Sequence, residues 1–240
     1  DKALRINLNQ NIYGTFAEIG AGQETVRNFF RAGASSRTIA KAMSAYDKDF
    51  SDAIYGEEID GRYVTESRLK KMLTHEINLV EQRLSREKHP EKLFFSYANT
   101  VATIDFAKQN KGHGWVGIVY QLEPDEPYNE ITLHIRFREN DAKLQQETLG
   151  ILGVNLIYGA FYKYNDPKKI LRYLYDHLDK DQIEIDTINF SGPRFAEVDN
   201  RLMSLQLVKN GMTDAVMFGP DGKNILPATV LYKKNILALR

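Results

Sequence analysis

The sequence of 240 residues contains no cysteine. This absence excludes disulfide bonds, thiol nucleophiles and zinc clusters built on cysteine. An excess of charge of one sign is also lacking, because 32 basic residues balance 32 acidic ones. With a formal net charge of zero, no overall electrostatic field attracts the chain to nucleic acid or to anionic lipid, so neither partner is expected.

Long hydrophobic runs are absent as well. The longest, residues 150–162, is too short to span a bilayer, and the first ten residues, DKALRINLNQ, lack the apolar core of a signal peptide. These features predict a cytoplasmic protein. The hydrophobic content of 42% is enough for a sizeable core. We therefore predict a single α/β domain over residues 1–240, with residues 139–141 as the place for an internal boundary.

Glycine is concentrated in residues 12–33, IYGTFAEIGAGQETVRNFFRAG. Gly20 and Gly22 directly precede residues 23–31, where apolar side chains recur at helical spacing, so the pattern predicts a loop followed by a helix. Unpaired N–H groups at a helix N-terminus favour an anion, and glycines let it approach the backbone. The candidate ligand-binding residues here are Glu18, Gly20, Gly22, Gln23 and Arg27.

This stretch completes no nucleotide-binding motif. The dinucleotide fingerprint requires a third glycine where the chain has Thr25, and the Lys-Ser/Thr of the NTPase phosphate loop is absent. The string EIGAG resembles the first motif of S-adenosylmethionine methyltransferases, which follows a long buried strand, but we expect Tyr13-Gly14-Thr15 to interrupt such a strand. Alternatively, the glycines only allow a tight turn and close packing beneath the helix.

A second helix is predicted at residues 38–43, capped by Ser35 or Ser36, and an acidic loop follows. The spacing of four residues in this loop approaches that of a calcium-binding loop, although Asp52 stands where the sharp turn requires glycine. The four are Asp47, Asp49, Ser51 and Glu58. The interpretation we favour is a solvated acidic loop.

The central residues predict a covering helix and an antiparallel meander. Thr65 caps an amphipathic helix, and strands are expected at residues 93–102, 115–122 and 130–138. The last strand alternates cleanly, so its second face meets water or another polar layer. The short connection at residues 123–129 makes the last two strands antiparallel.

A long helix capped by Asp141 is predicted to end near residue 163. It contains Gly150, Gly153 and Gly159, each of which costs about 1 kcal/mol relative to alanine. Close approach of another helix or strand would offset that cost. The alternative is a ligand that lies against this face near Asn155.

The closing segment predicts a βαβ unit with a parallel pair: a strand at residues 183–190, a helix at 195–210 and a strand at 214–218. Its first loop leaves the carboxyl end of a strand, which is where open α/β sheets bind ligands. The candidate ligand-binding residues here are Ser191, Arg194, Asn200 and Arg201, with Asp199 as a candidate catalytic residue. Alternatively, Asp199 is a helix-start residue favoured by the dipole and the arginines are ion-paired.

The five histidines show no close spacing, so the sequence suggests no metal site. His113, in KGHGW, is the one within a glycine-flexible loop that enters a strand. It is a candidate general acid or base, provided that the fold supplies a partner. The alternative is a solvated loop histidine.

Five strings, YGTFAEIGAGQE, TIAKAMSAYD, GHGW, LGVNLIYGAFY and VDNRLMSLQLV, resemble a bacterial protein family known under two labels, TonB-dependent receptor and nicotinate-nucleotide adenylyltransferase. The resemblance covers nearly the whole chain and implies the amino-terminal half of a longer protein. A receptor requires many alternating barrel strands. The adenylyltransferase requires a His-x-Gly-His signature, whereas Asn110 precedes Lys111-Gly112-His113 here. Neither label therefore supplies a mechanism.

Two functions remain open. The first is a cytoplasmic domain, part of an enzyme, that binds a small anionic metabolite such as a nucleotide through the two loops; no cofactor is identified. The second is a non-catalytic assembly module that forms a homo-oligomer or packs against a missing carboxyl-terminal half. It would use the glycine-bearing helix and a surface of tyrosines, namely Tyr158, Tyr162, Tyr164, Tyr173 and Tyr175. Convergence of the two loops on one pocket would favour the first.

Overall fold

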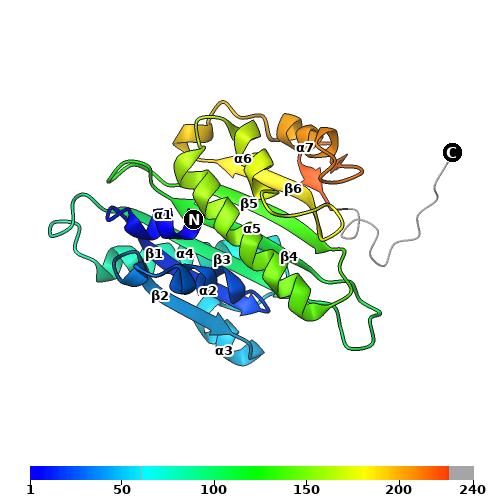
Figure 1. Cartoon of the computed structure of the whole chain (residues 1–240), viewed down its shortest axis with the longest axis horizontal. Helices are drawn as coiled ribbons and strands as arrows, with labels where there is room; N and C mark the ends of the chain where they lie inside the picture. The colour runs from blue at the N-terminus through cyan, green and yellow to red at the C-terminus, as the bar shows by residue number, and fades with distance from the viewer. Residues whose placement is uncertain (60, 227–240) are drawn as a thin grey trace.

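The computed structural model describes residues 1–59 and 61–226 (Figure 1). In chain order the elements are α1 (Lys2–Leu8), β1 (Ile12–Gly20), α2 (Glu24–Ala32), η1 (Ser35–Arg37), β2 (Ile39–Ala45), α3 (Lys48–Tyr55), α4 (Glu66–Arg83), β3 (Leu93–Ala102), β4 (His113–Tyr120), β5 (Asn129–Phe137), α5 (Ala142–Tyr162), α6 (Pro167–Leu174), β6 (Ile183–Ser191), η2 (Pro193–Phe195), α7 (Asn200–Lys209), β7 (Met217–Phe218) and β8 (Asn224–Ile225).

A six-stranded mixed sheet forms the centre of the fold, with the order β2-β1-β3-β4-β5-β6. β1 pairs in parallel with both β2 and β3, and β3 to β6 form an antiparallel meander. The predicted fold class, a mixed sheet with a meander and helices on its faces, is confirmed. The sheet takes strands from both sides of residues 139–141.

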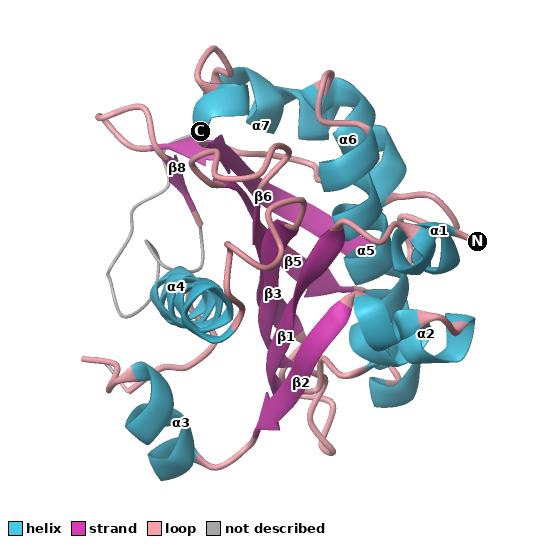
Figure 2. Ribbon diagram, turned by 90° about the vertical axis from the view of Figure 1, so that its left-hand side faces the viewer, coloured by secondary structure: helices cyan, strands magenta, loops and turns pink. Residues whose placement is uncertain are grey.

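Helices cover both faces of this sheet (Figure 2). On one face, α1, α2, α5 and α6 enclose a core that contains Phe16, Phe95 and Leu152. On the other face, α3 and α4 cover a smaller core that contains Ala17 and Leu69. Neighbouring residues of a strand point to opposite faces, so β1 contributes to both cores. None of the helices in the described part of the chain is long and apolar enough to cross a membrane.

The βαβ unit lies at the amino end of the chain, which corrects our placement of it at the carboxyl end. β1, α2 and β2 form the unit, and β1 and β2 are parallel. At the carboxyl end, β7 has only two residues and pairs antiparallel with β8 in a separate sheet. β7 consists of two apolar residues, Met217 and Phe218, but it is too short and too exposed to form a strand of the central sheet.

Two further expectations near the amino end are wrong. Residues 39–43 belong to β2 rather than to a helix, because backbone pairing with β1 outweighs the helix preference of alanine and lysine. Tyr13-Gly14-Thr15 does not interrupt β1 either. A Cβ on Gly14 would lie 2.1 Å from the Phe95 carbonyl oxygen, so glycine allows β1 and β3 to pack closely there.

The glycines of α5 permit close packing of helices, as we expected. A Cβ at Gly153 would lie 2.2 Å from Thr25 Oγ1 of α2 and 2.6 Å from the Tyr97 hydroxyl of β3. A Cβ at Gly150 would lie 2.7 Å from the Glu24 Cβ. The predicted start of this helix is also confirmed, because the Asp141 carboxylate accepts the Leu144 N–H at 2.9 Å.

Candidate functional site

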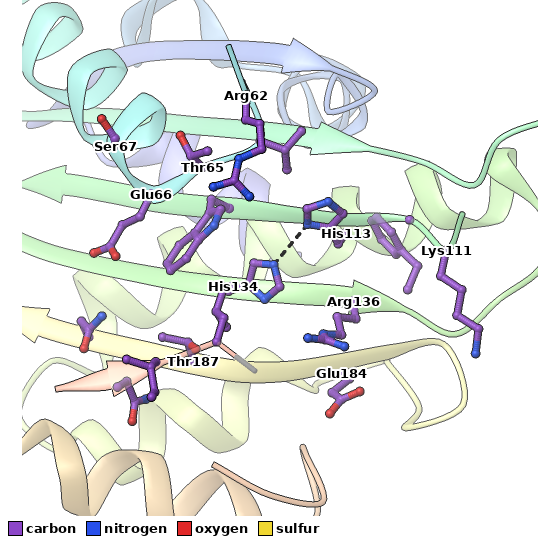
Figure 3. A pocket seen from close by; sticks show the side chains of 18 of the residues that line it. Arg62, Thr65, Glu66, Ser67, Lys111, His113, His134, Arg136, Glu184 and Thr187 are labelled. Carbon is purple, nitrogen blue, oxygen red and sulfur yellow. Dashed lines mark hydrogen bonds between the residues drawn. The ribbon is translucent and has the colours of Figure 1, made fainter. Parts of the chain in front are cut away.

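A cavity of about 1250 Å³ lies on the sheet face that α4 only partly covers (Figure 3). Its floor is the polar face of β4, β5 and β6. Its walls come from the connection between α3 and α4, from the first turn of α4 and from β8. α4 packs against β1, β3 and β4, which leaves the polar side chains of β5 and β6 facing open space.

The connection between α3 and α4, which forms one wall of the cavity, is held in place by Arg68, whose side chain is fully buried. Its guanidinium donates to Asp52 at 2.7 Å and lies 4.8 Å from the centre of the Tyr63 ring, while the Tyr63 hydroxyl donates to Asp52 at 2.6 Å. Asp47 caps α3. These contacts place the near-calcium motif in a helix and in ion pairs, so it does not form a calcium loop. The described residues include no group of three potential metal ligands.

Cross-strand pairing arranges the floor of the cavity in rows. In the first row His113 pairs with Arg136, which pairs in turn with Glu184. The second row runs from Trp115 through His134 to Thr187. The third runs from Gly117 through Thr132 to Asn189, and of these three only Asn189 lines the cavity. The alternation of β5 predicted a polar second face, and that face is the floor of the cavity.

A β-bulge in β6 brings a carboxylate to this floor. The register shifts so that His134 pairs with Thr187 and Ile135 with Ile185, which leaves Asp186 as the extra residue. Asp186 is 8% exposed, and its two oxygens reach two side chains of β5. Oδ1 lies 2.7 Å from His134 Nδ1, and Oδ2 accepts from Arg136 Nε at 2.9 Å.

The hydrogen bonds continue from Asp186 through His134 to His113. The second ring nitrogen of His134, Nε2, lies 3.2 Å from His113 Nδ1. A carboxylate only accepts, so His134 carries its proton on Nδ1 and accepts at Nε2 when it is neutral. His113 must then donate from Nδ1. The network thus assigns a tautomer in which His113 Nε2 has a lone pair, and that atom has no hydrogen-bond partner in the described part of the chain.

The surroundings keep His113 neutral. Burial is the largest cause of a pKa lowered to about 4, and the neighbouring His134 and Arg136 lower it further, while Asp186 acts in the opposite direction. At neutral pH the ring is therefore uncharged. A neutral imidazole with a fixed tautomer can accept a proton from a bound molecule.

Most charges around the cavity are paired. Arg138 lies 3.3 Å from Glu184, and Lys71 lies 3.0 Å from Glu58. Lys111, at the entrance to β4, forms no ion pair within the described residues. Arg136 is paired with Asp186 at 2.9 Å, so among the described residues Lys111 supplies the unpaired positive charge at this end of the cavity.

The glycine-rich loop lies elsewhere, and neighbouring atoms fill its surroundings. Gly20 has a φ of 81°, and a Cβ there would lie 2.0 Å from the Val101 carbonyl oxygen. A Cβ on Gly22 would lie 1.8 Å from Asn99 Oδ1. This geometry matches the alternative of a tight turn packed closely against β3.

The side chains of Gln23 and Arg27 form contacts within the same segment of the chain. The Gln23 amide donates to the Gly20 carbonyl at 2.5 Å. Arg27 pairs with Glu24 at 2.5 Å, so its charge is neutralised.

Glu18 lies beneath the loop and is 1% exposed. Burial is the largest cause of a pKa raised to about 8, which hydrogen bonds from the Val26 backbone and from Ser44 partly oppose. Its Oε1 and the Oδ1 of Asn99, its cross-strand neighbour, both lack a hydrogen-bond partner. When Glu18 is protonated, its carboxyl O–H can donate a hydrogen bond to Asn99 Oδ1.

The two predicted loops do not share a pocket, so the convergence that would favour an anion site built from both loops is not met. β6 runs opposite to β1 and is separated from it by three strands, so Ser191 and Gly20 lie at opposite ends of the sheet. Within the second loop, Arg194 pairs with Glu126 at 2.9 Å.

The start of α7 likewise uses its polar side chains locally. Asp199 accepts the Arg201 N–H at 2.9 Å and holds the Arg201 guanidinium at 3.0 and 2.8 Å. These hydrogen bonds lower the pKa of Asp199 to about 2. Asn200 exchanges hydrogen bonds with the backbone of Phe190. The geometry is that of a helix start with an ion pair.

The surfaces named for the assembly module are largely occupied by the same chain. The glycine face of α5 contacts α2, β3 and α6. The tyrosines meet α1, where Arg5 lies 4.6 Å from the centre of the Tyr162 ring and Lys2 lies 5.5 Å from that of Tyr173. Asn155, the candidate on this helix, donates to the carbonyl oxygens of Leu174 and Asp176. A homo-oligomer stays a prediction, and it would use another surface.

Among the sequence candidates, the fold provides His113 with the partner that a general acid or base requires. His134, Arg136 and Asp186 were missed, because nothing in their spacing announces a contact that depends on strand pairing and on a bulge. The usable signal was the polar face of β5, which contains two of the three.

Comparisons with known proteins add little to this geometry. No family model matches the chain, and no curated protein matches it. A crystal structure described as a competence-damaged protein (CinA) superfamily protein from Enterobacter cloacae matches 66% of this chain and 88% of its own, with 11% sequence identity and a TM-score of 0.44. A similarity at this level does not extend to activity.

Proposed function

We propose that the chain binds a small anionic metabolite in the cavity over β4, β5 and β6, and that His113 exchanges a proton with it. The observation that carries this proposal is the hydrogen-bonded series Asp186, His134 and His113, which ends at the cavity. A histidine held by a buried carboxylate through a second ring is oriented and has a defined tautomer.

Each residue has a distinct role in this proposal. His113 touches the ligand and accepts the proton at Nε2. His134 and Asp186 are positioning residues that fix the tautomer of His113. When His113 takes up a proton, the negative charge of Asp186 stabilises the resulting cation. When His113 is neutral, Arg136 balances the charge of Asp186. Lys111 contributes positive charge for an anionic group.

The protonation states are tested by NMR on protein with 15N-labelled histidine. We expect His113 and His134 to be protonated on Nδ1 at pH 7 and His113 to titrate near pH 4. An Asp186→Asn exchange should change the tautomer of His134, because the amide can donate where the carboxylate only accepts. A His113 ring that titrates near its ordinary pKa of about 6.5, or that carries its proton on Nε2, contradicts the proposed role.

Turnover is tested by incubating the protein with a library of anionic metabolites and following their loss by mass spectrometry. Wild type should consume at least one compound, and His113→Asn should be slower by about 100-fold, because Asn keeps a donor near Nδ1 and lacks Nε2. His177→Asn is the matched control, since that side chain is 84% exposed. Protection against melting without turnover would indicate a binding module rather than an enzyme.

A further inference from the structure

The floor of the cavity changes its chemistry along the strands. At one end lie Lys111 and the row of His113 and Arg136. Figure 3 shows Lys111 and Arg136 toward one side of the pocket and Ser67 toward the other. At this end a ligand meets Lys111, whereas Arg62 and Lys71 belong to the wall formed by the α3–α4 connection and α4, where Lys71 is paired with Glu58.

The opposite end presents uncharged hydrogen-bonding groups. Asn189 of β6 lies at this end, and Thr187 lies between it and the first row, beside His134; their side chains form no hydrogen bond within the described residues. Thr187 is only 4% exposed, and its hydroxyl has no protein partner within the described residues. A ligand with hydroxyl or amide groups could form hydrogen bonds with both of these side chains.

The separation of the two ends sets the length of the ligand. Arg136 and Thr132, the partner of Asn189, are four residues apart on β5. At a rise of about 3.3 Å per residue, the two rows lie about 13 Å apart. The cavity volume of about 1250 Å³ is ample for a metabolite of that length. A short acid would occupy one end and leave the other unpartnered.

We propose that the ligand is a phosphorylated sugar compound that is long enough to reach both ends, such as a nucleoside monophosphate. Its phosphate lies beside Lys111 and Arg136, next to His113, and its uncharged end bonds to Thr187 and Asn189. This inference rests on the proposed function and specifies its ligand. Phosphate fits the cationic end because it carries close to two negative charges and several acceptor oxygens.

The test is calorimetric titration of the whole chain with ligands that form a ladder of lengths: inorganic phosphate, ribose 5-phosphate and adenosine 5′-monophosphate. Adenosine tests the need for phosphate, and glucuronate against glucose 6-phosphate distinguishes carboxylate from phosphate. We expect Kd to fall along the ladder and the two unphosphorylated compounds to bind at least tenfold more weakly than their phosphorylated counterparts.

Two variants separate the ends. Lys111→Gln should weaken every phosphorylated ligand by about tenfold, whereas Lys143→Gln, at an 83% exposed lysine on α5, should change none. Asn189→Ala should weaken adenosine 5′-monophosphate by about three- to tenfold and leave inorganic phosphate unchanged. Circular dichroism of each variant confirms that it is folded.

The outcomes distinguish this inference from the proposed function. Equal weakening of inorganic phosphate and the nucleotide by Asn189→Ala, or glucuronate as tight as glucose 6-phosphate, overturns the ligand assigned here while the role of His113 stands. Binding of adenosine with the same Kd as adenosine 5′-monophosphate also overturns the assigned ligand and leaves the role of His113 unaffected. Failure of every anion to bind or to shift the His113 signals overturns both.

Discussion

Two polar clusters lie on the same sheet and differ in what surrounds them. The cluster beneath α2, with Glu18, Thr25, Tyr97 and Asn99, is sealed by α5 and by the glycine-rich loop. The cluster of His113, His134 and Asp186 borders a cavity. The first resembled a ligand site in the sequence because glycines precede a helix, yet those glycines allow packing. Of the second, the sequence indicated only His113.

The comparison predicts that changes in the sealed cluster alter stability, whereas changes in the open cluster alter the function proposed above. Atoms of the sealed cluster touch protein on every side, so a change there disturbs packing or leaves a buried polar group without a partner. Changes beside the cavity meet open space and can be accommodated. The predictions below test this division, from the largest expected effect to the smallest.

The largest effect is expected from Gly153→Leu on α5. A Cβ there would already lie 2.2 Å from Thr25 Oγ1, so the longer side chain must push α5 away from α2. We expect destabilisation of about 3 kcal/mol or more in urea unfolding. The matched control is Gly159→Ala, whose Cβ would lie 3.3 Å from Ile170 and which should change stability by less than about 1 kcal/mol. Similar values for the two would mean that α5 is not tightly packed.

A smaller, pH-dependent effect is expected from Glu18→Gln. The pKa of Glu18 is raised from 4.5 to about 8 in the folded chain, mainly by burial. Between those values the folded state keeps a proton that the unfolded state releases, so the stability of wild type falls as pH rises from about 4.5 to 8. The glutamine side chain does not titrate in this range, and its amide N–H can donate a hydrogen bond to Asn99 Oδ1 at every pH.

Glu18→Gln should therefore be more stable than wild type by a few kcal/mol at pH 8, and the advantage should shrink toward pH 5. Urea unfolding at several pH values measures it. Glu147→Gln, at a half-exposed position of α5, should leave the pH profile unchanged. A Glu18→Gln profile parallel to that of wild type would show that Glu18 is ionised in the folded chain.

The smallest effect is expected from Tyr97→Phe, which removes the hydroxyl that lies 3.1 Å from Thr25 Oγ1. Loss of one buried hydrogen bond should cost about 1 kcal/mol in urea unfolding. The His113 titration followed by NMR should not move, because β3 carries Tyr97 on the face opposite to the cavity. A shift in that titration would show that the two clusters are coupled.

Much of the fold could be predicted from local patterns. The alternation of β5, the caps at Thr65 and Asp141, and the close packing at Gly153 each depend on neighbouring residues, and each is confirmed. β1 was missed because Gly14 lowers strand propensity, while the reason for that glycine, the Phe95 ring, lies far along the chain.

The site was less accessible to sequence reasoning. His113 was found because a histidine flanked by glycines stands out. Its partners lie at residues 134 and 186, and their contact requires two strand pairings together with a bulge that re-aims Asp186. No periodicity encodes a bulge. The carboxylate was therefore invisible until the register of β5 and β6 was known.

The position of β1 between β2 and β3 also shapes the order of folding. Ile12 pairs with Leu93, whereas β3, β4 and β5 follow one another closely along the chain and pair in that order. Closing the longer loop costs more chain entropy, so the meander can form before β1 docks onto it. During synthesis the first βαβ unit must wait, with one edge of β1 unpaired, until β3 has left the ribosome.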